Sequence, residues 1–139
     1  MFKNSKIPIW VNLFLIVIIL LMVVQVFQFY FGHQTLLDAG ISIQSVADLN
    51  IIYTTAGRLT AMAAASIFVL ITQNPYQHLV IWLMSIFREG QEMFIDPLFP
   101  YANAPASPIV DFGVHVVIIA LEIAAFVVVY RITRQDNNV

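Results

Sequence analysis

Five charged side chains interrupt long apolar stretches of the sequence. They are Arg58, Arg88, Glu89, Glu92 and Glu122. A charge near the centre of a bilayer costs at least ~2.5–3.5 kcal/mol on insertion scales, so each is expected to face protein, water or another charge. Glutamates transfer protons or bind cations, and arginines bind carboxylates or phosphates. Any chemistry of this chain is therefore expected at these positions and at His115, which lies in the same apolar stretch as Glu122.

The composition makes these charges conspicuous. The chain has 139 residues, of which 60% are hydrophobic and only 10% are charged. That charged fraction is less than half of the ~25% typical of soluble domains, so a soluble fold could not cover its surface. The absence of cysteine excludes disulfides and thiolate metal sites. The sequence also lacks phosphate-binding loops, serine-hydrolase elbows and zinc-protease motifs, and its few terminal cations form no basic stripe, so no nucleic-acid partner is expected.

Four apolar segments are long enough to cross the bilayer, at about 7–32, 49–72, 76–95 and 109–132. We therefore expect an all-α integral membrane protein, a single domain built as a bundle of four transmembrane helices. The first segment is too long for a signal peptide and is expected to span. Asn74 and Ser107 each precede a proline and mark the starts of the third and fourth helices. Asp96 also precedes a proline and is expected to end the third helix.

The cations flanking the apolar segments predict the orientation. Lys3, Lys6, Arg131 and Arg134 lie near the two chain ends. The two longer connections, 32–48 and 96–108, contain no Lys or Arg, so both termini are expected in the cytoplasm and both connections outside. The first connection suits a short helix or hairpin in the interface, and the second is stiffened by four prolines. An outward-facing acidic pocket under these loops is expected, with Asp96 and Asp111 at its outer rim.

The helical period places the polar residues on narrow faces. On the third helix, a sector of roughly 60° holds His78, Ser85, Glu89, Glu92 and Asp96. On the fourth, a sector of roughly 40° holds Asp111, His115 and Glu122. On the second, Arg58 stands beside a small-residue stripe, Gly57, Ala61 and Ala65, of the kind that lets membrane helices pack closely. A bundle with these edges turned inward would satisfy all of them.

The buried charges do not balance. Two arginines face three glutamates, so they can hold the helices in register by neutralising two acids, but one carboxyl group is left over. The spacing of Arg88 and Glu92 suits an intrahelical pair. Glu122 is the deepest acid by helical rise, and Arg58 is its only expected cationic neighbour.

Other polar residues have simpler interpretations. Glu89, Glu92, His115 and Glu122 are ligand types of metal centres in helix bundles, but a di-metal centre needs a Glu-x-x-His on each of two helices, and the sequence has none. No metal is therefore expected, and a mononuclear site is the weaker alternative. His33 and His78 are interpreted as interfacial residues. Ser85 is expected to bond its own helix backbone and not to act as a nucleophile.

The pattern resembles the DoxX-like group of small bacterial four-helix membrane proteins. The resemblance lies in a first span ending in Tyr30-Phe31-Gly32, in Arg58 followed by the small-residue run 60–66, in Arg88 with Glu89-Gly90, and in Glu122. It implies a bacterial inner-membrane location and an accessory or small-molecule-binding role, in some relatives linked to quinones or oxidative stress. The proline-rich connection after Asp96 departs from that pattern.

Three functions are open at this point. The first is a non-enzymatic membrane component that binds a quinone, a lipid or a partner subunit through the cluster. The second is a proton- or ion-conducting homo-oligomer that uses Glu122, His115 and Glu89 as a relay. The third is an enzyme acting on a lipid or quinone, with Glu89 or Glu122 as acid or base and Arg58 stabilising an anion.

Overall fold

The computed structural model describes residues 6–104 and 106–136 and forms helices throughout, with no strand among those residues. The helices are α1 (Ile9–Phe31), α2 (His33–Asp38), α3 (Val46–Thr72), α4 (Pro75–Leu98) and α5 (Pro108–Asp136). Within this described part, α1, α3 and Pro108–Gln135 of α5 are long and apolar enough to cross a membrane. The chain is therefore an all-α integral membrane protein. α4 is comparably long, but its second half carries four charged side chains, Arg88, Glu89, Glu92 and Asp96.

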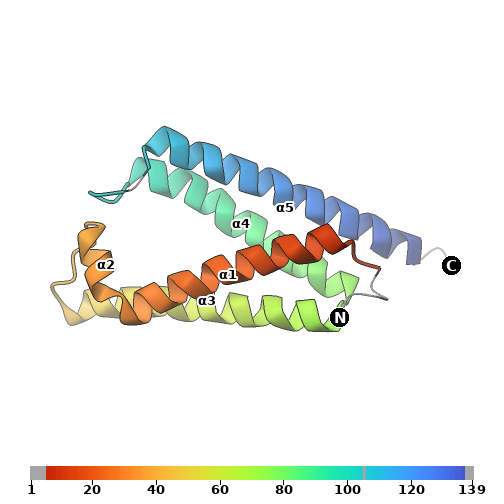
Figure 1. Ribbon diagram of the computed structural model, residues 1–139, viewed down its shortest axis with the longest axis horizontal. Helices are drawn as coiled ribbons and strands as arrows, with labels where there is room; N and C mark the ends of the chain where they lie inside the picture. The colour runs from red at the N-terminus through yellow and green to blue at the C-terminus, as the bar shows by residue number, and fades with distance from the viewer. Residues whose placement is uncertain (1–5, 105, 137–139) are drawn as a thin grey trace.

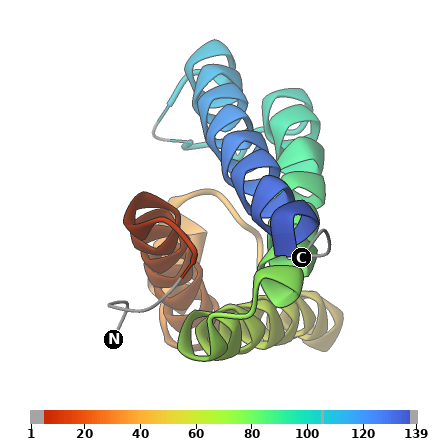
Figure 2. The same ribbon diagram turned by 90° about the vertical axis from the view of Figure 1, so that its right-hand side faces the viewer.

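The long helices form two antiparallel pairs (Figure 1). α1 packs along α3 and α4 packs along α5, whereas contact between the pairs is much less extensive. α1 begins and α5 ends at one end of the molecule, which we call the terminal end, and the opposite end is the α2 end. The pairs lie closest near the terminal end and diverge towards the α2 end, and the view from the terminal end shows α4 with α5 on one side and α1 with α3 on the other (Figure 2).

The apolar core joins the two pairs where they converge. Trp82 of α4 is completely buried, and its ring stacks on that of Phe14 of α1 with 5.4 Å between centroids. Nearby, the side-chain amides of Asn12 and Gln73 exchange hydrogen bonds of 3.0 and 3.1 Å between α1 and the end of α3. Gln73 has a left-handed φ of 53°, which lets the chain turn from α3 into α4 within two residues.

The predicted helix ends are close to the observed ones, with three corrections. α5 continues to Asp136 and does not end near residue 132. α3 begins at Val46 and not near residue 49, because Ser45 and Asp48 form a reciprocal capping box. α4 runs through Pro97 to Leu98, so the predicted end at Asp96 was wrong. Pro97 lies in the last turn of α4, where a missing N–H removes little intrahelical bonding. The predicted start of α4 is confirmed, with Asn74 accepting hydrogen bonds from the first backbone N–H groups.

Two loops tie the diverging pairs together at the α2 end. The first contains α2, as the expected short helix, and then turns at Gly40, whose φ of 91° favours glycine. A Cβ on Gly40 would stand 2.7 Å from the Cβ of Ala102 in the second loop. Asn103 donates from its backbone to the Ala39 carbonyl (3.2 Å) and from its side chain to that of Asp38 (2.8 Å). The separation of the pairs is thus fixed at this end by loop contacts.

Candidate functional site

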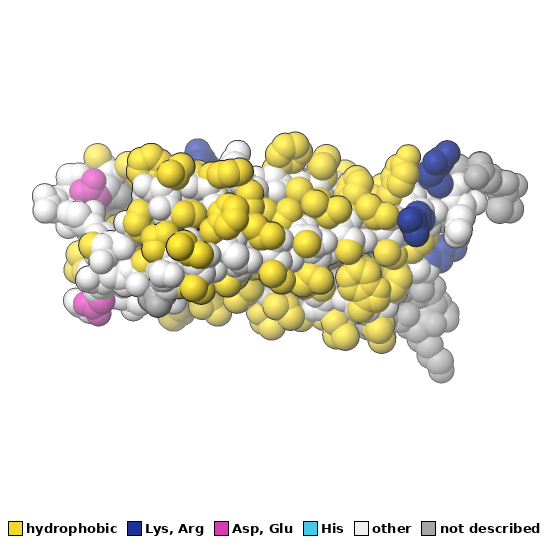
Figure 3. All heavy atoms as spheres, turned by 90° about the horizontal axis from the view of Figure 1, so that it is seen from above, with side chains coloured by type: hydrophobic (Ala, Val, Ile, Leu, Met, Phe, Trp, Pro, Cys, Tyr) yellow, Lys and Arg dark blue, Asp and Glu magenta, His cyan; other side chains and the backbone are white. Residues whose placement is uncertain are grey.

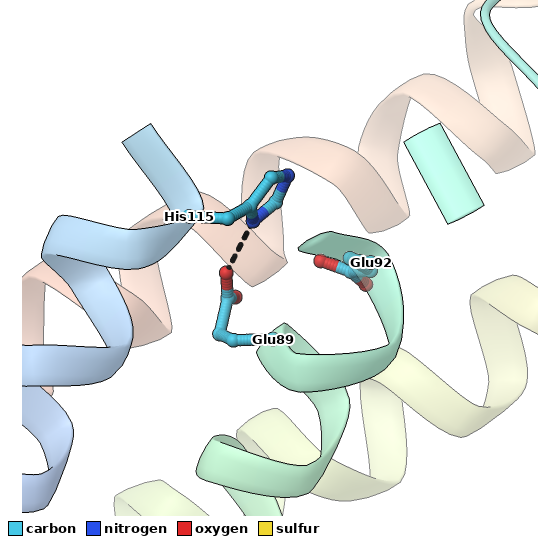
Figure 4. Close-up of side chains that lie close together, drawn as sticks. All are labelled: Glu89, Glu92 and His115. Atoms are coloured by element: carbon cyan, nitrogen blue, oxygen red, sulfur yellow. Dashed lines mark hydrogen bonds and ion pairs between the residues drawn. The ribbon is translucent and has the colours of Figure 1, made fainter. Parts of the chain in front are cut away.

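A buried ion pair and a histidine link α4 to α5. Glu89 is almost fully buried, and Arg88 donates from Nη2 to its Oε1 atom. The other carboxylate oxygen, Oε2, lies 2.9 Å from Nδ1 of His115. Figure 4 shows Glu89 and His115 pointing towards each other, with Glu92 one turn further along α4. The predicted polar faces of these two helices therefore do meet.

The same histidine extends the cluster towards the α2 end. Its Nε2 atom lies 3.4 Å from Oδ2 of Asp96 and 3.8 Å from Oδ2 of Asp111. Ligand atoms of Glu89, Glu92 and His115 lie within 4.8 Å of one another, a spacing that a cation could share. However, both oxygens of Glu89 are already engaged, one by Arg88 and one by His115. A metal would have to displace one of these partners, so we describe the group as a hydrogen-bonded ion-pair cluster.

A second polar link between α4 and α5 lies deeper in the bundle. The hydroxyl of Ser85 donates to Oε1 of Glu122, and both side chains are buried. The prediction that Ser85 bonds its own helix backbone was therefore wrong. The expected pairing of Arg58 with Glu122 was also wrong, because α3 packs against α1 and turns Arg58 away from α5. The other oxygen of Glu122, Oε2, is buried without a partner among the described residues.

This second link predicts a measurable coupling. Ser85→Ala removes the donor and leaves the carboxyl group of Glu122 buried and unsatisfied, so it should lower the free energy of unfolding by about 1–3 kcal/mol. The double variant Ser85→Ala/Glu122→Leu removes both polar partners and should recover most of that loss. Unfolding in mixed micelles with increasing denaturing detergent measures both. If Ser85→Ala and the double variant lose the same free energy of unfolding, the two side chains are not coupled.

A groove of about 770 Å³ opens between α3 and α4, where the two pairs diverge. Arg58, Leu59 and Met62 line it from α3, and Met84, Phe87 and Arg88 line it from α4. Ala61 and Ala65 also line this groove, so the predicted small-residue stripe does not pack against another helix as expected; it leaves the groove open. The small residues that are buried in α3 are Ala56, Ala63 and Ser66.

The groove brings the two membrane-embedded arginines to one surface. Arg58 lines it from α3 and Arg88 from α4, together with Gln91 and Glu92. Arg58 is exposed and has no hydrogen bond or ion pair with any residue that the structure describes. The spacing of Arg88 and Glu92 had predicted a pair between them, but Arg88 pairs with Glu89 instead. The groove could not be seen in the sequence, although helical rise places both arginines at similar depth.

The expected acidic pocket is present at the α2 end in a smaller form. A cavity of about 210 Å³ lies between the ends of α4 and α5 and is lined by Asp96, Asp111 and residues of the proline-rich loop. The first loop contributes none of the lining described. Tyr101 forms part of its wall, and burial, with Asp96 and Glu92 nearby, raises the pKa of its hydroxyl above the ordinary value.

The two remaining histidines differ in environment. His33 lies at the α2 end, where its Nε2 atom is 3.3 Å from the hydroxyl of Tyr53, in keeping with an interfacial position. His78, the fourth residue of α4, is completely buried, and neither ring nitrogen has a partner in the described structure; its interfacial position in the membrane stays a prediction.

Comparison with known proteins adds no relative. No protein-family model, curated protein or solved structure matches the chain. The resemblance to the DoxX-like group therefore stays a prediction.

Proposed function

We propose that the protein is a non-enzymatic membrane component that binds one amphiphilic molecule, a lipid or a quinone, in the groove between α3 and α4. The observation that carries this proposal is the groove itself, because it combines an apolar lining with two arginines. Its volume of about 770 Å³ falls within the ~300–1,000 Å³ of typical small-molecule sites. Such sites are mostly apolar with a few polar groups that orient the ligand.

The distribution of charged side chains along the molecule supports a topology in which both termini lie in the cytoplasm. On the face shown in Figure 3, Lys and Arg gather mostly at the terminal end, and acidic side chains lie at the α2 end. Retention of cations on the cytoplasmic side favours cytoplasmic termini in a bacterial inner membrane. α4 has 24 residues, about 36 Å of helix, and its acids largely face α5, so we propose that it is the fourth span of the bundle.

Photolabelling tests the proposed binding. The purified protein is placed in vesicles of phosphatidylcholine and phosphatidylglycerol whose acyl chains carry a diazirine. We expect saturable labelling concentrated in residues 55–65 and 84–95. Competition by an excess of a short-chain quinone would assign the groove to quinones.

Two tryptophan variants provide the matched comparison. Ala65→Trp places a large ring in the groove and should abolish the saturable labelling. Ala64→Trp adds the same ring at the neighbouring exposed position, which does not line the groove, and should leave labelling unchanged. Uniform labelling of all lipid-facing helices, unaffected by either variant, contradicts the proposal.

Proton transfer is the second candidate function, and one observation favours it. Asp96 and Asp111 approach His115, which in turn contacts Glu89, so polar groups lead inwards from the α2 end. A conducting homo-oligomer would also have to use Glu122, and pH-jump measurements on liposomes with Glu122→Gln test this. An unchanged proton flux in that variant would contradict a proton relay through Glu122.

The enzymatic hypothesis has less support. Neither Glu89 nor Glu122 lines the groove, so an amphiphile bound there would not meet the expected acid or base. A partner subunit in place of a lipid remains an alternative occupant, and its presence would appear as a stable second component in native gels of the solubilised membrane.

A further inference from the structure

The charge of the groove indicates which chemical class of headgroup it can bind. Arg58 is the thirteenth residue of the 27-residue helix α3, so it lies near the middle of an apolar span. Charged side chains at such depth normally pair with another charge or with a polar group. Arg58 has no such partner among the described residues, whereas Arg88 donates to Glu89. Of the two arginines of the groove, Arg58 is therefore the one without a counterion from the described residues.

The groove is polar at one end and apolar at the other. α3 and α4 run antiparallel, so the early part of the α3 wall lies level with the late part of the α4 wall. At this level, towards the α2 end, all the polar and charged groups of the lining lie together with two apolar ones: Thr55, Arg58, Arg88, Gln91 and Glu92, with Leu59 and Ile95. Nearer the α3–α4 turn, the lining consists of Ala61, Met62, Ala65, Met84 and Phe87. An amphiphile bound with its headgroup towards the α2 end would match this gradient.

The charged lining favours an anion over a neutral headgroup. Two arginines and one acid, Glu92, line the groove; Glu89 neutralises Arg88, which leaves Arg58 as the cation available to a ligand. Guanidinium groups bind phosphate oxygens through paired, charge-assisted hydrogen bonds. Glu92 is the one competing anion of the lining, but no ion pair joins it to Arg58.

We infer that the groove selects a lipid with an anionic phosphate headgroup, held by Arg58 with its acyl chain along the apolar part of the groove. This inference rests on the proposed function, since it specifies the ligand of the same groove. An occupied site would give Arg58 the counterion that the protein does not supply. A quinone carries no charge, and the phosphate of phosphatidylcholine is balanced by its own choline ammonium, so neither would supply the net negative charge that neutralises Arg58.

Native mass spectrometry with defined lipids tests the inference. The detergent-solubilised protein is titrated with phosphatidylglycerol or phosphatidylcholine of identical acyl chains, and adducts are counted. We expect a single saturable site that binds the anionic lipid about tenfold more tightly, as one charge-assisted contact predicts. Arg58→Gln should reduce its binding to the level of phosphatidylcholine, and Arg58→Lys should keep part of the preference.

Two further variants separate the outcomes. Arg134→Gln removes a cation at the terminal end, outside the groove, and should not change the preference. Glu92→Gln should maintain or increase it; a loss of preference would show that Glu92, and not Arg58, orients the headgroup. If both lipids bind equally and Arg58→Gln has no effect while Ala65→Trp still abolishes binding, the anionic ligand is wrong and the proposed groove stands. If neither lipid binds saturably to the wild type but a short-chain quinone does, the anionic ligand is wrong and the proposed groove stands; if none of the three binds, both proposals fail.

Discussion

Glu89→Leu is expected to lower the free energy of unfolding by about 3–5 kcal/mol, because it leaves the mostly buried Arg88 without its counterion. The side chain of Glu89 is only 4% exposed and that of Arg88 18%, so water cannot replace the lost partner fully. His115 also loses its hydrogen bond at 2.9 Å. Reversible unfolding in mixed micelles, followed by circular dichroism, measures the loss.

Two companion variants make the result interpretable. Arg88→Met/Glu89→Leu removes both charges and should recover most of the stability, since an apolar pair of similar volume is often as stable as a buried ion pair. Glu92→Gln changes an acid one turn away that forms no hydrogen bond or ion pair with the described residues, and should change stability by less than about 0.5 kcal/mol. A loss of under about 1 kcal/mol for Glu89→Leu would contradict a structural role for the ion pair.

Trp82→Ala is expected to lower the free energy of unfolding by about 3–5 kcal/mol. The reason is packing: Trp82 is fully buried where the two helix pairs meet, and its ring stacks on Phe14. Helix association in lipid depends on such packing, because lipid tails are as apolar as the core. Truncation would leave a cavity where Trp82 of α4 stacks on Phe14 of α1, and the same micelle unfolding assay measures the cost.

The controls for Trp82 separate packing from hydrogen bonding. Its Nε1 atom is buried without a partner in the described structure, so Trp82→Phe keeps an aromatic ring and should cost much less than the alanine variant. Leu83→Ala truncates an adjacent side chain that is 46% exposed and should cost little. Equal losses for Trp82→Ala and Leu83→Ala would mean that the two helix pairs do not depend on this contact.

The helices and their polar faces could be predicted because both depend on local sequence. Long apolar runs are directly visible, and a period of 3.6 residues places Glu89 and His115 on the faces that meet in the structure. Helix ends were predicted where a strong local signal was recognised, as at Asn74. The capping box at Ser45 is an equally local signal that was missed.

The pairing of helices could not be predicted in the same way. Depth alone suggested that Arg58 would reach Glu122, but depth does not say which helices are neighbours. α3 packs on α1 and α5 packs on α4, so these two residues belong to different pairs. The groove could not be predicted for the same reason, because it exists only where the two helix pairs diverge. That divergence depends on helix tilt and on loop contacts between residues far apart in the sequence.

The contacts of Asn103 at the α2 end have a consequence for how the ligand of the groove can change. The short turn at Gln73 joins the helix pairs at the terminal end, and Asn103 joins them through Asp38 and Ala39 at the other. The width of the opening is therefore held by contacts at the two ends of the groove and not by the side chains that line it. Exchange of a few lining residues would alter which molecule fits while the frame stayed the same. A scaffold of this kind can diversify its specificity without redesigning its fold.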